Sequence, residues 1–222
     1  MNYPADMLPQ SWLWLAGIVY LLVLGYAILT TRWRQYIDEP HRAHVFLGSS
    51  VALILLWQIT TTRLPGLEYH YLGATLMTLM FGWQRALVVI SLVLVGLIYH
   101  GSSDWQTYPL NVLVMGLTPI LISYGILRLA EHKLPHHVFI YIFINGFFGA
   151  ALAMAGAAAV AAGLLLLAGA YSPERLAYDY FPYLPLMMFP EAFITGMFTS
   201  ILVAMRPEWI VTFDDGKYIR GK

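Results

Sequence analysis

Two histidines are the residues of this sequence best suited to bind one ligand together. His70 and His100 each lie at the end of a short apolar segment, and the charge pattern below places both on the same side of a membrane. The N-terminal segment, with its α-amine and Asp6, is expected on that side too. Imidazole and amine nitrogens suit nickel, cobalt, copper and zinc. These groups could converge on one metal site, or both histidines could be interfacial residues with polar tips among the lipid headgroups.

Two further polar residues are expected within the membrane. Glu191 lies eight residues into the last apolar segment, and an intramembrane carboxylate is costly and therefore a candidate for function. The alternative is a protonated or hydrogen-bonded glutamate that pins two helices together. Asn111, just inside the fifth apolar segment, has the same two interpretations. It either orients a metal-binding imidazole or only bridges helices.

Small residues form a ladder in the sixth apolar segment. They recur every four residues and therefore share one helix face: Gly149, Ala153, Ala157 and Ala161. Such residues let a second helix approach closely in lipid. The ladder predicts either an internal packing seam or a docking surface for a partner subunit.

The composition indicates which elements must position these residues. The chain is 59% hydrophobic and 11% charged, whereas soluble domains carry about 25% charged residues. A transmembrane helix needs about 20 apolar residues. Seven segments qualify, two of them short: 12–30, 45–61, 71–83, 86–99, 110–130, 137–168 and 183–205. The expected fold is an all-α, polytopic membrane bundle of about seven transmembrane helices, although residues 71–99 could instead form one re-entrant hairpin.

The basic residues predict the orientation of the bundle. With the N terminus outside, ten of the 12 lysines and arginines are cytoplasmic, and only Arg63 and Arg175 are external. Positive charge of this kind marks the cytoplasmic side. We expect one transmembrane domain over residues 1–205, with an external tip at 1–11, and a cytoplasmic tail at 206–222. The formal net charge of zero implies no nucleic-acid partner. The predicted location is a bacterial inner membrane, crossed several times.

Five segments in order carry a family resemblance. They are the opening Met1-Asn2-Tyr3-Pro4-Ala5-Asp6-Met7-Leu8-Pro9, the stretch Leu64-Pro65-Gly66 with Tyr69-His70-Tyr71-Leu72-Gly73, the run Leu97-Ile98-Tyr99-His100-Gly101, residues 111–119, and Pro190-Glu191-Ala192-Phe193-Ile194-Thr195-Gly196. Together they resemble the CbiM/NikM-type membrane subunits of cobalt- and nickel-specific energy-coupling factor (ECF) transporters. The likeness covers nearly the whole chain.

The resemblance implies a metal-uptake permease with a specific ion site. In that family the N-terminal tip folds into the membrane domain and chelates the ion, which carries over to Met1, Asn2 and His70. Position 2 is asparagine here rather than the family's histidine, so His100 could replace the missing imidazole, or the metal could be copper or zinc. The implied partners are the lipid bilayer, a transmembrane coupling subunit and paired cytoplasmic ATPases. No permanent cofactor is expected.

Other functions compete with metal uptake. The fold could carry a different small solute or act as a non-transporting membrane scaffold. An enzyme is a weaker alternative. The sequence contains an HxxxHH box at 132–137 and an HxxH box at 41–44, as in membrane di-iron enzymes, but five histidines are too few for such a site and Pro135 interrupts the helix. We therefore expect no enzymatic activity. No GxxxxGK[ST] motif occurs, so energy would come from a partner or a gradient.

Overall fold

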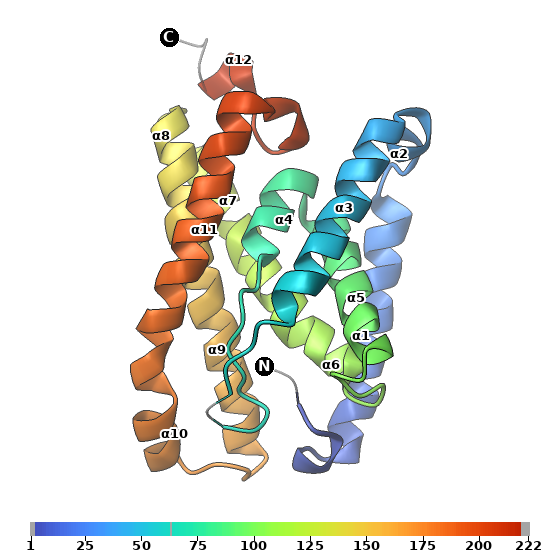
Figure 1. Ribbon diagram of the computed structural model, residues 1–222, viewed down its shortest axis with the longest axis vertical. Coiled ribbons are helices and arrows are strands. Elements are labelled where there is room, and N and C mark those ends of the chain that lie inside the picture. Colours follow the sequence, from blue (N-terminus) through green and yellow to red (C-terminus); the bar gives the residue numbers. More distant parts are fainter. Residues whose placement is uncertain (1–2, 63, 219–222) are drawn as a thin grey trace.

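The protein is a bundle of helices, as the composition predicts (Figure 1). The computed structural model describes residues 3–62 and 64–218, and within these ranges the only β-type pairing is a single antiparallel bridge between Thr61 and Tyr69. Among the described residues, four helical segments are long and apolar enough to cross a membrane: Gln10–Thr30, Tyr108–Lys133, Val138–Leu167 and Pro173–Met205. The prediction of an all-α membrane bundle is confirmed.

The seven predicted segments correspond to the following elements, some of them continuous stacks of shorter ones. They are α1 (Gln10–Thr30), α3 (Pro40–Trp57), α4 (Ala74–Phe81), α5 (Trp83–Tyr99), α6 with η2 and α7 (Tyr108–Asn111, Val112–Leu117, Thr118–Lys133), α8 with η3 and α9 (Val138–Ile140, Tyr141–Phe148, Gly149–Leu167), and α10 with η4 and α11 (Pro173–Asp179, Phe181–Tyr183, Leu184–Met205). The short elements are η1 (Ala5–Met7), α2 (Arg34–Asp38), η5 (Pro207–Trp209) and α12 (Asp215–Tyr218). Segments η2 and η3 are π-helical, a geometry often found at functional sites.

The third predicted span is the one that differs most from expectation. Helix α4 has eight residues, all of them buried. At about 1.5 Å per residue it is too short to cross a bilayer. It begins after Gly73 and ends at Gly82, which have φ angles of 66° and 80°. Both are positive φ angles, which glycine adopts without steric cost.

The C-terminal segment completes the far end of α4. The Leu79 carbonyl accepts bonds from the Thr212 N–H (3.3 Å) and hydroxyl (2.7 Å), and the Met80 carbonyl accepts one from the Val211 N–H (3.0 Å). Thr212 also lies 2.6 Å from the Tyr141 hydroxyl. The last carbonyls of a helix have no partner within it. The segment after residue 205, expected as a polar tail, therefore returns to the bundle and caps a buried helix.

The small-residue ladder lies inside the bundle. Gly149, Ala153, Ala157 and Ala161 are all buried, and α9 packs against α7 and α11. On a neighbouring face, a Cβ at Gly156 would overlap the side chain of Ile122. The four residues therefore form an internal packing seam. The alternative prediction, a docking surface for a partner subunit on this face, is wrong because the face is buried.

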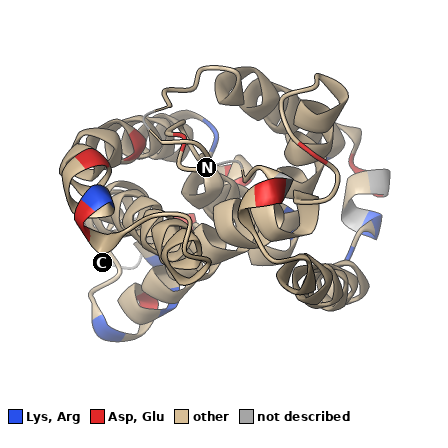
Figure 2. Cartoon of the chain, turned by 90° about the horizontal axis from the view of Figure 1, so that it is seen from below, with Lys and Arg blue, Asp and Glu red and all other residues tan. Residues whose placement is uncertain are grey.

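Basic residues concentrate at one end of the bundle. Helices α2, α8 and α12 lie at that end and α10 lies at the other (Figure 1). Arg34 belongs to α2 and Lys217 to α12, whereas Arg175 lies in α10. Seen from below, charged residues are sparse along the chain (Figure 2). This distribution of positive charge is the one expected if the end with α12 faces the cytoplasm. The orientation of the bundle stays a prediction.

The cap on α4 predicts a specific cost for losing one hydroxyl. Replacing Thr212→Val keeps the side-chain shape but removes the bond to Leu79 and the partner of the Tyr141 hydroxyl. We expect the free energy of unfolding in detergent to fall by about 1–3 kcal/mol. The matched control is Thr30→Val, which removes an exposed threonine bond to the Tyr26 carbonyl (2.7 Å) and should have a smaller effect. Equal losses in the two variants would contradict the capping role.

Candidate functional site

The site is organised by the loop that joins α3 to α4. Thr61 and Tyr69 pair through two backbone hydrogen bonds of 2.8 Å each. The turn between them includes a bond from the Leu67 N–H to the Leu64 carbonyl (3.0 Å). Successive side chains of an extended chain point to opposite sides. Glu68 and His70 accordingly share one side of the returning segment, and Tyr69 and Tyr71 share the other.

Glu68 and His70 line a cavity of about 230 Å³, which we call the His70 cavity. Its wall includes imidazole, carboxylate, amide and hydroxyl groups, all of which can donate to or coordinate a polar ligand. The other lining residues are Trp57, Gln58, Thr60, Leu94, Leu97, Ser102 and Met115. Three elements meet here, namely the end of α3, the second half of α5 and the π-helical segment η2.

The His70 imidazole is held in a fixed place. Its exposed fraction is 9%, and its ring lies 4.4 Å from the Trp57 ring, centroid to centroid. Burial lowers the pKa of His70 well below its usual value, so the ring is neutral near pH 7. Nδ1 lies 3.3 Å from the Tyr71 carbonyl oxygen. In the tautomer that donates this bond, Nε2 carries the free lone pair that a metal ion needs.

Glu191 fixes the backbone that follows His70. Its two carboxylate oxygens accept the N–H groups of Leu72 (2.7 Å) and Gly73 (2.9 Å). Glycine is favoured at position 73 for a second reason besides its positive φ, since a Cβ would lie 2.7 Å from Leu53 Cδ1. On the other side of the segment, the Trp57 indole N–H donates to the Leu72 carbonyl (3.2 Å). Residues 70–73 are therefore clamped between α3 and α11.

Asn111 holds the N-terminal segment in the bundle. Its Oδ1 accepts the Tyr3 N–H (3.2 Å), and its amide donates to the Thr107 hydroxyl (3.2 Å). Tyr3 is 1% exposed. A Cβ on Gly66 would lie 3.6 Å from the Tyr3 ring and 3.5 Å from Pro4 Cδ. The chain therefore enters the bundle beside the loop that carries His70.

The predicted site residues are only partly brought together. Met1 and Asn2 lie outside the described residues. His100 follows the last residue of α5, is exposed, and does not line the His70 cavity. Within residues 3–62 and 64–218, no group of three or more histidine, cysteine, aspartate or glutamate residues could hold a metal ion.

Glu68 is the site residue that sequence reasoning missed. It precedes His70 by two positions, the spacing that places two side chains on one side of an extended segment. That signal was hidden because the segment 71–83 was interpreted as a helical span beginning directly after His70.

Comparisons with known proteins were consistent with one another. The sequence profile of the family described as the cobalt uptake substrate-specific transmembrane region matches residues 2–209. A crystal structure of a transition metal transporter is similar, with a TM-score of 0.75 and 20% identity, covering 92% of this chain and 93% of that one. A truncated transition metal transporter gives a TM-score of 0.71 and 21% identity, covering 92% and 99%. No curated protein matches the chain.

The Glu191 clamp predicts a local change in hydrogen exchange. In Glu191→Gln, one of the two oxygens becomes an NH₂ group that cannot accept a backbone N–H. Leaving a buried donor without its acceptor costs about 1–3 kcal/mol, so the amide that loses its acceptor, at Leu72 or Gly73, should exchange about 5- to 100-fold faster. The measurement is hydrogen–deuterium exchange of the peptide that covers 69–77, with Glu208→Gln as an exposed control. Unchanged exchange in Glu191→Gln would refute the clamp.

Proposed function

This chain belongs to the cobalt uptake substrate-specific transmembrane family, and on that premise we propose that it binds a divalent transition-metal ion in the His70 cavity and passes it across the membrane. The ion is the cargo and not a resident cofactor. Nickel and cobalt are the first candidates, and copper and zinc accept the same nitrogen ligands.

The observation that carries the proposal is the position of His70. The imidazole is buried at the wall of a cavity whose lining also includes the Glu68 carboxylate. This arrangement suits the capture of a cation, since Nε2 can offer its lone pair when Nδ1 donates to the Tyr71 carbonyl, and the ring already packs against Trp57. Glu68 lies on the same wall and adds negative charge.

The remaining ligands are proposed from the family resemblance. The Met1 amine and the backbone nitrogen of Asn2 would complete the coordination, and His70 supplies the imidazole. The bond between Asn111 and Tyr3 supports this arrangement, because it brings the N-terminal segment to the loop that carries His70. Asn111 and Glu191 are thus proposed as positioning residues that do not contact the ion.

Transport against a gradient requires an energy source. We propose that a transmembrane coupling subunit and cytoplasmic ATPases supply it, in a bacterial inner membrane. The resemblance to energy-coupling factor transporters supports these partners, and the concentration of basic residues at the end that carries α12 supports the orientation.

The principal test is the metal content of protein purified with its native, untagged N terminus. After loading with nickel or cobalt, we expect His70→Ala to lose affinity by about 100-fold or more, since losing a residue that merely orients a ligand already costs about 10- to 100-fold. Isothermal titration with each metal measures the change.

His100→Ala is the matched control for this test. His100 is exposed and lies outside the His70 cavity, so its loss should leave affinity unchanged. A loss in His100→Ala equal to that in His70→Ala would place His100 among the ligands. Unchanged binding in His70→Ala, or no metal bound by the unmodified protein, would refute the site and favour a different solute or a scaffold role.

A further inference from the structure

An apolar groove lies open between α3 and α11, with the short helix α4 between them (Figure 1). Its volume is about 630 Å³, and we call it the α4 groove. Buried side chains of α4, namely Leu76, Met77 and Met80, form its floor. Phe198 lines the wall on the α11 side and is exposed. The groove is therefore an apolar indentation in the outer surface of the bundle.

The wall on the α3 side is built partly from small residues. Gly48, Ser49 and Ala52 line the groove, and Gly48 and Ala52 are exposed. A Cβ on Gly48 would meet nothing beyond its own stretch of helix within 4 Å. The side chains of the protein thus leave this space unfilled. In a bundle that crosses a membrane, hydrocarbon tails as apolar as leucine surround such a surface.

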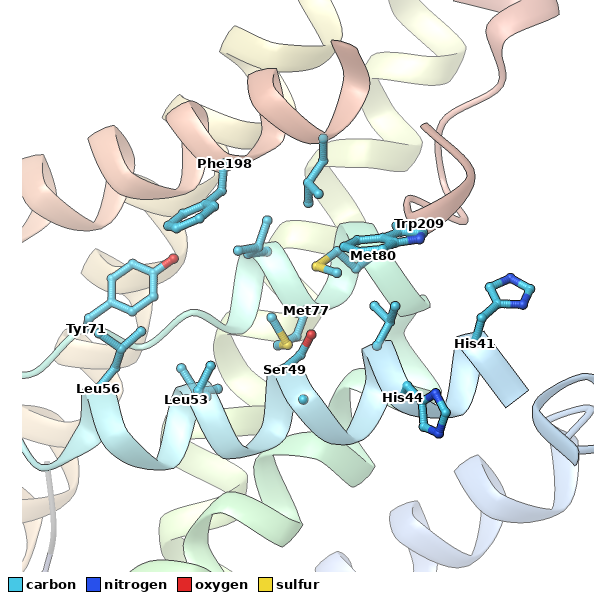
Figure 3. Close-up of a pocket in the computed structure, with 15 residues that line it drawn as sticks. His41, His44, Ser49, Leu53, Leu56, Tyr71, Met77, Met80, Phe198 and Trp209 are labelled. Carbon is cyan, nitrogen blue, oxygen red and sulfur yellow. The ribbon is translucent and has the colours of Figure 1, made fainter. Parts of the chain in front are cut away.

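Polar and aromatic side chains gather at one end of the α4 groove. His41, His44 and Trp209 lie at that end, and Leu56 and Tyr71 lie at the other (Figure 3). The two histidines belong to the first two turns of α3 and are the HxxH pair of the sequence, which the His70 site does not use. Tryptophan is enriched where hydrocarbon meets water, and histidine tips reach the headgroups there. We therefore place this end at the membrane surface.

The charges beside this end suit a phosphate group. Arg42 donates to Glu39 (2.6 Å), and Arg206 lies 3.6 Å from Glu208. The Arg206 guanidinium carbon lies 6.0 Å from the centroid of the Trp209 ring. Both carboxylates thus have an arginine partner, which offsets their repulsion of an anion. Guanidinium and imidazole N–H groups can then donate to the phosphate of a lipid.

The dimensions of the groove suit one hydrocarbon chain. From His44 to Leu56, α3 extends about 18 Å, at about 1.5 Å per residue. One leaflet accounts for about 15 Å of the hydrocarbon core, so a chain with its headgroup at His44 can follow the groove within its own leaflet. A partner helix about 10–12 Å across would occupy about 1,400 Å³ or more over the same length. It would lie on the rim and leave the floor unfilled.

We propose that the α4 groove binds one glycerophospholipid, with an acyl chain along α4 and the phosphate beside His44. This site is separate from the His70 cavity, and it does not depend on which solute the protein carries. The bound chain would fill the space between α3 and α11 and support α4 from the outer side.

The test is the number of lipids that stay on the full-length protein during purification. The protein is reconstituted in vesicles of equal amounts of phosphatidylethanolamine and phosphatidylglycerol, extracted again in detergent and weighed by native mass spectrometry. Lipid that merely surrounds the bundle washes away, whereas we expect one phospholipid per chain to be retained. Retention of none would overturn the proposal. A lipid-free dimer would also overturn it, because a second copy of the chain would then cover the groove.

Filling the groove should displace the lipid. In Gly48→Trp an indole takes up the open space, and we expect the retained lipid to fall by about fivefold or more, since overpacking is costly. The matched control is Gly125→Trp, because Gly125 is an exposed glycine of α7 with equally open surroundings, outside the groove. Ala52→Phe adds less bulk and keeps the proposal testable if Gly48→Trp fails to fold. Equal retention in the groove and control variants would overturn the proposal.

The position of the phosphate is tested at His44, which is exposed. His44→Ala should lower the retained lipid by about two- to tenfold, the loss expected for one hydrogen bond. His132→Ala is the control, since His132 is an exposed histidine in the last turn of α7 and lies outside the groove. No difference between these two variants would overturn the placement of the phosphate.

A phosphatidylethanolamine with a diazirine in its acyl chain locates the bound lipid. After irradiation in vesicles, we expect adducts on the peptides that cover α4 and residues 44–56. Adducts spread evenly over these peptides and α1, which also exposes many apolar side chains, would indicate bulk lipid only and overturn the proposal. These experiments contain no metal, so their outcome is independent of the loss of metal binding expected in His70→Ala.

Discussion

A short helix buried in a membrane bundle must find partners for its end groups, and that requirement shapes much of this structure. The first N–H groups and last carbonyls of any helix lack partners within it, and lipid offers none. Two N–H groups just ahead of α4 reach the Glu191 carboxylate, and its last carbonyls accept bonds from Val211 and Thr212. The eight-residue helix α4 thus connects the loop with His70, helix α11 and the C-terminal segment.

Buried backbone outside the helices has a similar requirement, and the polar residues of the site meet it. Glu191 and Asn111 are buried, and each binds backbone groups from a segment more than 100 positions away in sequence. A carboxylate that accepts two backbone N–H groups and an amide that accepts one are satisfied polar groups, so both are tolerated in the interior. In membrane proteins, irregular backbone is tolerated where it is buried in protein or lines a cavity. Here Leu67, Tyr69 and Leu72 are buried, and Glu68 and His70 line a cavity.

Much of the fold could be predicted because lipid imposes long apolar runs. The segments 12–30 and 110–130 differ from α1 and α7 with its preceding turns by only a few residues. The short α4 and the return of Thr212 could not be predicted, since both depend on contacts between distant segments and α4 is as apolar as a span. At the site, His70 and the polar character of Asn111 and Glu191 were visible in the sequence. Glu68 was not, because its place on the same cavity wall as His70 depends on an extended chain at 68–70.

The hydrogen bond from the Tyr3 N–H to Asn111 has a consequence for biogenesis. The two residues are 108 positions apart, so the first residues made on the ribosome wait for their partner. At about 5–20 residues per second, that delay is on the order of 5–20 seconds, and the wait for Glu191 to meet the loop is longer still. The proposed ion site is therefore among the last parts of the molecule to be completed during synthesis, because Glu191 belongs to the final long helix. An unfinished chain would be inserted in the membrane before the proposed site is assembled, so that site would capture no metal until synthesis is complete.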